Sequence, residues 1–138
     1  MLFRSDPEAY VILEHLGTGT EERELAHYGT DAGKPGMLLW GKMTDPYNET
    51  TMGYGGSASN FERIHHARRG WTVPNLVGYM ESHDEERLMY KNLMFGACSN
   101  HPSGGSGCES DPGEYNVRDL PTALHRMEAA GEIGRAHV

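Results

Sequence analysis

The sequence lacks the features that mark several common classes of protein. No apolar run approaches the ~20 residues of a membrane span, and residues 1–10 hold no apolar signal-peptide segment, so neither a transmembrane helix nor an export signal is predicted. Basic residues are scarce: 12 Lys and Arg stand against 20 Asp and Glu, a formal net charge of −8. Nucleic-acid binding needs clustered Lys and Arg to neutralise phosphates, so no nucleic-acid or membrane partner is expected.

Cysteine is also scarce, and the histidines lack a metal-binding spacing. Zinc sites need three or four ligands in a closed geometry, which no spacing among the eight histidines provides, so no metal ligand is predicted. Cys98 and Cys108 are the two cysteines, and they flank a glycine-rich segment. They could form a disulfide, which would fit a secreted or periplasmic protein, or they could remain free thiols.

Glycine, by contrast, is abundant. It supplies 18 of the 138 residues, about twice the average share of ~7%. The length allows one ordinary domain of ~100–200 residues. The glycine excess indicates either many loops or a piece of a larger, loop-rich fold.

Short apolar runs alternate with helical patterns along the chain. Strands buried on both faces are predicted for the apolar runs at 9–13, 37–40 and 75–80. Helices are predicted over 20–28, 60–68, 85–93 and 119–130. Residues 42–56 are a polar stretch, and a loop is predicted over 96–113. This alternation is typical of parallel βα units. A parallel sheet of three strands has two unpaired edges and too little cover, so it would belong to something larger.

Capping residues set the predicted ends of the first and last helices. Thr20 is a candidate N-cap, and Gly29 ends that helix. Asp119 can cap the last helix, Pro121 lies in its first turn, and Gly131 ends it.

Acidic residues follow the first and third predicted strands. Glu14 ends the first, and Glu81-Ser82-His83-Asp84 follows the third. In α/β barrels the catalytic residues lie at these carboxyl ends, and paired carboxylates are what glycoside hydrolysis needs. Position alone leaves simpler roles open: Glu14 could cap a helix or pair with Arg23, and Asp84 could cap a helix.

Two motifs give this pattern a family resemblance. The sequences V-I-L-E-H-L (11–16) and Y-M-E-S-H-D-E-E-R (79–87) resemble the fifth- and seventh-strand motifs of the α-amylase family, glycoside hydrolase family 13. M-L-L-W-G (37–41) falls where the sixth strand would lie. The resemblance covers 7–131 and implies an α/β fold, an incomplete (β/α)8 TIM barrel of about three βα units. One departure is Ser82, where the family usually has Asn.

The resemblance also implies roles for the matching residues. Glu14 would be the proton donor, and Asp84 the carboxylate that binds sugar hydroxyls and stabilises the transition state. His83 would hydrogen-bond the sugar on the nonreducing side of the cleaved bond. Arg87 could contact sugar hydroxyls or carboxylates, or pair with Glu85, Glu86 or Asp119 at the surface. Calcium is common in the family, but its ligands come mostly from other parts of the barrel, so no cofactor is identified in this chain.

The family's nucleophile is expected outside this chain. Retaining members use an Asp after the fourth strand, and L-F-R-S-D at 2–6 invites a match to Asp6. Asp6 lies too close to Glu14, because a crossover between parallel strands needs at least ~10–12 residues. Residues 1–6 are therefore interpreted as an upstream remnant. The C-terminal heptapeptide at 132–138 matches what a common sequencing adapter encodes, and is interpreted as non-native; a natural C-terminus is the alternative.

The expected function is that of a fragment. The parent protein would hydrolyse α-1,4-glucosidic bonds in starch- or glycogen-like polysaccharides with retention, and the fragment alone would be inactive. Three alternatives stay open. They are a 1,4-α-glucan branching enzyme or related transglycosylase, a non-catalytic carbohydrate-binding module, and a small acidic α/β domain with chance motifs.

Overall fold

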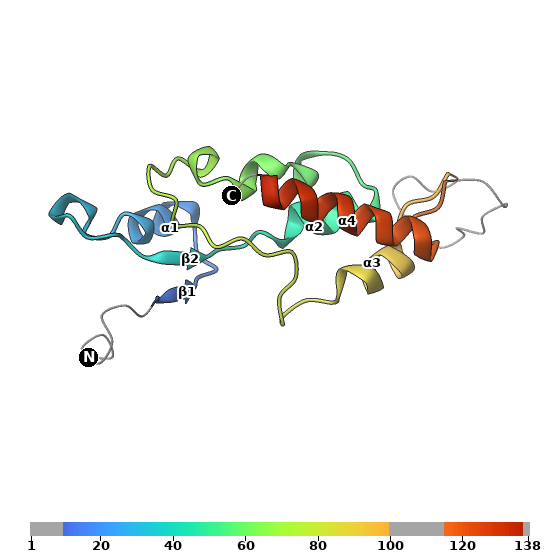
Figure 1. The fold of residues 1–138 in the computed structure, drawn as a ribbon, viewed down its shortest axis with the longest axis horizontal. Helices are drawn as coiled ribbons and strands as arrows, with labels where there is room; N and C mark the ends of the chain where they lie inside the picture. Colours follow the sequence, from blue (N-terminus) through green and yellow to red (C-terminus); the bar gives the residue numbers. More distant parts are fainter. Residues whose placement is uncertain (1–9, 100–114, 137–138) are drawn as a thin grey trace. The chain divides into compact units, whose positions relative to one another are not determined.

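The computed structural model describes residues 10–99 and 115–136, which form two compact units. Of these residues, the first unit contains 10–42 and 65–77, and the second contains 43–64, 78–99 and 115–136. None of the described helices is long and apolar enough to cross a bilayer. The main elements, drawn in Figure 1, are β1 (Ile12–Glu14), α1 (Gly19–Ala26), β2 (Leu38–Trp40), α2 (Thr44–Met52), α3 (Leu88–Phe95) and α4 (Leu120–Ala136).

The first unit is built on parallel strands, as the sequence predicts. β1 pairs with β2 in parallel, with Glu14 opposite Trp40. Leu39 of β2 also forms a parallel bridge with Leu76, through two backbone hydrogen bonds of 2.8 Å to the residues on either side of Leu76. β2 therefore pairs with both of the other apolar segments.

A small apolar core lies between α1 and the strands. Ala26, Leu39 and Trp71 are at most 2% exposed. The side-chain amide of Asn75 donates to the carbonyls of Ala26 and Pro35 at 2.9 and 2.8 Å, which ties α1 to the segment before Leu76. The partly buried residues packed against this core are Leu13, Leu25, Val73 and Leu76.

The start of α1 differs from the prediction. The N-cap is Thr18, not Thr20. The hydroxyl oxygen of Thr18 accepts from the N–H of Glu21 at 3.3 Å, and the Glu21 carboxylate accepts from the N–H of Thr18 at 2.9 Å. This reciprocal capping box satisfies two backbone donors that the helix cannot. The helix consequently begins at Gly19, and it ends at Ala26 before Gly29 is reached.

The second unit is a cluster of three helices. α2 packs against α3 and α4, and α3 packs against α4. The guanidinium of Arg126, on α4, donates to the carbonyls of Thr50 and Thr51, the latter at 2.9 Å. These are among the last carbonyls of α2, where a helix runs out of N–H donors of its own; the carbonyl of Thr50 also accepts from the N–H of Gly53 at 3.1 Å. The fully buried side chains of this unit include Met43, Thr44, Thr51, Leu88, Asn92 and Val117.

The helices within residues 42–68 differ from the prediction. No helix is predicted in the polar stretch at 42–56, but this stretch contains α2, whose Thr and Asn residues are weak helix formers and lie buried against α3 and α4. The predicted helix at 60–68 is instead a series of 3₁₀ turns at Ser57–Ser59, Phe61–Ile64 and His66–Arg69. There Asn60 and His65 accept from backbone N–H groups two residues ahead, and such local bonds compete with a helix.

Three further boundaries also differ. The strand predicted over 75–80 is reduced to the bridge at Leu76, and residues 78–80 make no ladder hydrogen bond within the described part of the chain. α3 begins three residues later than predicted, at Leu88. α4 runs through Gly131 to Ala136, because an interior glycine costs a helix only ~1 kcal/mol and Gly131 does not adopt a positive φ.

Candidate functional site

Glu14 is the last residue of β1, and its side chain is exposed. β1, β2 and the segment at Leu76 run parallel, so their carboxyl ends open on one edge of the sheet. Glu14 therefore occupies the position at which parallel α/β folds carry ligands and catalytic groups.

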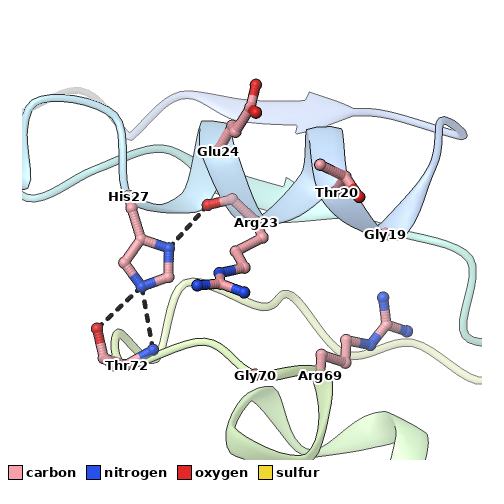
Figure 2. A pocket seen from close by; sticks show the side chains of 8 residues that line it. All are labelled: Gly19, Thr20, Arg23, Glu24, His27, Arg69, Gly70 and Thr72. Carbon is pink, nitrogen blue, oxygen red and sulfur yellow. Dashed lines mark hydrogen bonds between the residues drawn. The ribbon is translucent and has the colours of Figure 1, made fainter.

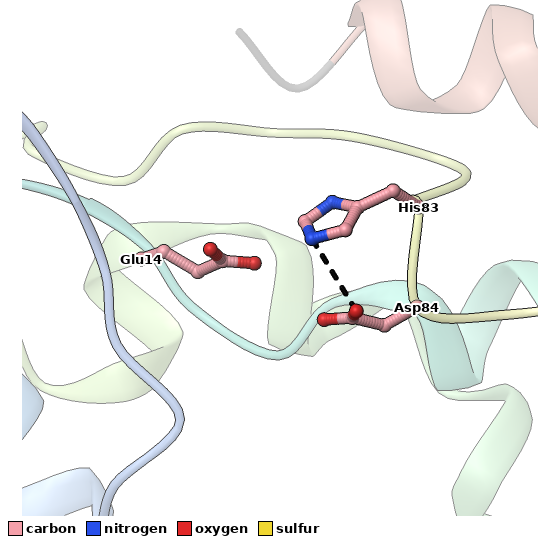
Figure 3. Close-up of side chains that lie close together, drawn as sticks. All are labelled: Glu14, His83 and Asp84. Atoms are coloured by element: carbon pink, nitrogen blue, oxygen red, sulfur yellow. Dashed lines mark ion pairs between the residues drawn. The ribbon is translucent and has the colours of Figure 1, made fainter.

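His83 and Asp84 lie in a turn that follows the third parallel segment. Figure 3 shows Nε2 of His83 directed at Oδ1 of Asp84, 3.3 Å away. Both side chains are largely exposed, at 65% and 58%. The N–H of Asp84 donates to the hydroxyl oxygen of Ser82 at 3.3 Å. The structure thus brings His83 and Asp84 together as a pair in the second unit, while Glu14 belongs to the first unit.

Arg87 follows the same turn and pairs with Glu81. Its guanidinium lies 3.5 Å from Oε2 of Glu81 and is 70% exposed. The other oxygen of Glu81 accepts from the N–H of Leu88 at 2.6 Å, at the start of α3. Arg87 therefore has an ion-pair partner that differs from the nearby carboxylates expected from the sequence.

Glu85 is a residue whose place the sequence does not predict. Its carboxylate accepts from the hydroxyl of Thr44 and from the amide of Asn48 at 3.0 Å, and it lies 3.4 Å from the ammonium of Lys91. Burial alone raises the pKa of Glu85, but these hydrogen bonds and the ammonium outweigh it and lower the pKa below its ordinary value. No local pattern indicates this cluster, because Thr44 and Asn48 lie 41 and 37 residues earlier in the chain.

A cavity of about 710 Å³ lies in the first unit, between α1 and residues 69–72. Figure 2 shows His27 forming one wall. Its Nε2 accepts from the N–H of Thr72 at 3.1 Å, so Nδ1 of the neutral ring carries the proton and donates to the carbonyl of Arg23 at 2.7 Å. The lining residues are Gly19, Thr20, Arg23, Glu24, His27, Arg69, Gly70 and Thr72.

One charged residue that lines this cavity, Arg69, is paired within the fold. Arg69 bonds Glu22 at 2.9 Å and the carbonyl of Lys42 at 2.9 Å. Glu22 is only 6% exposed, so this ion pair serves to hold residues 65–70 against α1. None of the residues predicted for the site lines the cavity.

Cys98 is disulfide-bonded and forms an antiparallel bridge with Asn116. Cys108 and Asp6 lie outside the described residues. For Cys98 the structure therefore selects the disulfide from the two alternatives that the sequence left open.

Comparison with known proteins adds no assignment to this geometry. No protein-family model matches the chain, and no curated protein is similar enough to count as a relative.

Proposed function

We propose that this chain is part of the catalytic barrel of a retaining, α-glucan-active glycoside hydrolase of the α-amylase type. The observation that carries the proposal is the parallel pairing of β1, β2 and the segment at Leu76. Consecutive segments that pair in chain order are the pattern of successive βα units in a barrel. The two motifs that resemble the family follow the first and the third of these segments.

On this proposal Glu14 is the general acid. Its exposed carboxyl group at the end of β1 protonates the glycosidic oxygen as the bond to the leaving sugar breaks. A proton supplied at this point avoids an alkoxide leaving group, and positioned acids of this kind contribute about 10²–10⁴-fold to rate. After the sugar departs, the same residue accepts a proton from the attacking water or hydroxyl.

Asp84 and His83 hold the sugar ring at the cleaved bond. The carboxylate of Asp84 accepts hydrogen bonds from sugar hydroxyls and faces the positive charge that develops at the anomeric carbon. An Nε2–H of His83 directed at Asp84 leaves Nδ1 to accept from another hydroxyl. Arg87, still paired with Glu81, can donate hydrogen bonds to hydroxyls of the next sugars along the glucan.

The nucleophile is not among these residues. A complete barrel of this type needs ~250 residues, and the 138 residues here supply about three of its eight βα units. The nucleophilic carboxylate and the other strands then belong to a longer protein, and this chain alone does not turn over substrate.

The proposal is tested in the longer protein that contains these residues. Glu14→Gln should lower kcat/KM on amylose by about 10²–10⁴-fold, measured as reducing ends released. Glu24→Gln is the matched control, because Glu24 is a carboxylate of the same unit on the exposed side of α1. Equal activity of the two variants would contradict a catalytic role for Glu14.

Product analysis separates the alternative functions. Release of α-configured maltooligosaccharides, seen by NMR of the fresh products, supports a retaining hydrolase. New α-1,6 linkages would instead identify a branching enzyme of the same family. Glucan binding without any turnover in the longer protein would contradict the proposal in favour of a binding module.

A further inference from the structure

The turn that carries His83 and Asp84 lies at the surface. Both side chains are more than half exposed and form an ion pair at 3.3 Å, and the N–H of Asp84 donates to the hydroxyl oxygen of Ser82 at 3.3 Å. An exposed turn of this kind samples many conformations unless its flanks are anchored. The residues on either side of it, Glu81 and Glu85, are both anchored.

Glu85 fastens the C-terminal side of the turn to α2. Each of its carboxylate oxygens accepts a hydrogen bond from this helix, one from Thr44 and one from Asn48. Thr44 is 1% exposed and Asn48 is 7% exposed. Lys91 of α3 adds an ion pair at 3.4 Å. The carboxylate therefore joins two helices at a point one residue beyond Asp84.

Glu81 fastens the N-terminal side to α3. One oxygen accepts from the N–H of Leu88, the first residue of that helix, at 2.6 Å. Leu88 is fully buried, so the position of this N–H is set by the packing of the helix. Arg87 neutralises the second oxygen at 3.5 Å. A carboxylate in this place also interacts favourably with the helix dipole.

We propose that Glu81 and Glu85 are positioning residues that hold the His83–Asp84 pair in the geometry needed to bind a sugar. The expected effect on catalysis rests on the proposed function. The expected effect on the turn rests only on the hydrogen bonds and ion pairs that Glu81 and Glu85 make with α2 and α3. The two carboxylates bracket the pair in the chain, and each is bonded to a helix of the second unit. Neither touches substrate in this arrangement; they act through the turn between them.

The positioning role predicts an effect of Glu85→Gln on rate and on the order of the turn. A displacement of about 1 Å at a catalytic group can cost ~10²-fold, so we expect kcat of the longer protein on amylose to fall about ten- to a hundredfold, with a smaller change in KM. Glu86→Gln is the matched control, since Glu86 is the next carboxylate, is 65% exposed, and among the described residues forms its ion pair with Lys91, at the longer distance of 3.9 Å.

NMR relaxation supplies a readout that does not depend on activity. Backbone order parameters of residues 82–84 should fall towards the flexible range below ~0.6 in Glu85→Gln and not in Glu86→Gln, with α2 and α3 unchanged. Thr44→Val, which keeps the side-chain shape and removes one hydrogen bond, should move residues 82–84 in the same direction if Glu85→Gln does not fold.

The outcomes separate the two proposals. Suppose that the order parameters of residues 82–84 fall in Glu85→Gln but the longer protein does not turn over glucan. That result would support the positioning role of Glu85 and overturn the proposed function. Glucan turnover that depends on Glu14, with unchanged order and unchanged kcat in both Glu85→Gln and Thr44→Val, would overturn the positioning role.

Discussion

A single carboxylate, that of Glu85, joins α2 to α3 and also borders the His83–Asp84 pair. It is 27% exposed, and its partners are two hydrogen-bond donors and one ammonium group. An ionised carboxylate with such partners is more stable in the folded protein than in water, whereas its protonated form loses most of the benefit. The link between the two helices is therefore sensitive to acid.

The stability that Glu85 contributes to the fold should therefore decrease in acid. The pKa of Glu85 is lowered from 4.5 in the folded protein, so its contribution to stability is complete above pH 4.5 and is lost as pH falls through the lower folded value. The melting temperature of Glu85→Gln should lie below wild type at neutral pH and approach it in acid. A gap between the two that stays constant into acid, measured by circular dichroism, would contradict this account.

The start of α1 shows which capping signal in the sequence determines where a helix begins. Two threonines stand at the start of α1, and each could serve as N-cap. Only Thr18 has Glu21 three residues later and makes both bonds of the capping box. Thr20 lies one residue inside the helix. The pair can therefore be compared directly by substitution.

We expect Thr18→Ala to destabilise the first unit by about 1 kcal/mol, and Thr20→Ala to change its stability much less. Urea unfolding followed by Trp71 fluorescence is the measurement, because Trp71 lies in the core of that unit. The reverse order of the two variants would place the helix start where the sequence alone puts it.

Gly131 and Gly53 allow a second comparison, between a glycine inside a helix and a glycine at the end of one. Gly131 lies inside α4 without a positive φ, and a Cβ there would meet only Sδ of Met80, at an ordinary 3.6 Å. Gly131→Ala should therefore stabilise the helix by up to ~1 kcal/mol. Gly53, at the C-cap of α2, has φ 89°, so Gly53→Ala should cost about 1–3 kcal/mol.

Thermal unfolding of the two glycine variants decides between the predicted and the observed end of α4. If the helix stopped at Gly131 in a left-handed conformation, Gly131→Ala would destabilise the protein as Gly53→Ala does. Opposite signs for the two variants are the result that the structure predicts.

Elements with a strong local pattern could be predicted, and elements that depend on distant contacts could not. The runs at β1 and β2 are short, apolar and bounded by turns. β2 lies within its run, whereas β1 ends one residue beyond its run, at Glu14, and is not buried on both faces. α2 depends on burial of residues such as Thr51 and on Arg126, 75 residues away, which bonds its last turn. Nothing in 42–56 indicates this contact.

The same division holds for the candidate site. The sequence shows that Glu14, His83 and Asp84 follow apolar segments, and the structure places Glu14 at the end of β1 and the other two in a turn. The anchoring of Glu85 could not be predicted, since its partners come from α2. The partner of Arg87 also differs, because Glu81 turns towards the start of α3.

At the scale of the whole molecule, the candidate residues are divided between the two units. The first holds the parallel segments and Glu14, and the second holds the anchored turn with His83 and Asp84. Retaining glycoside hydrolysis needs an acid, a nucleophile and groups that hold the sugar. On the proposed function, this chain would supply the first and the last, and a longer protein would supply the nucleophile.

The most direct test of the central claim compares Glu14→Gln on two substrates in that longer protein. Amylose needs a proton on its leaving oxygen, whereas α-maltosyl fluoride loses fluoride without one. The account predicts that kcat/KM falls about 10²–10⁴-fold on amylose and far less on the fluoride. Equal losses on both substrates, or no loss on amylose, would contradict the assignment of Glu14 as the general acid.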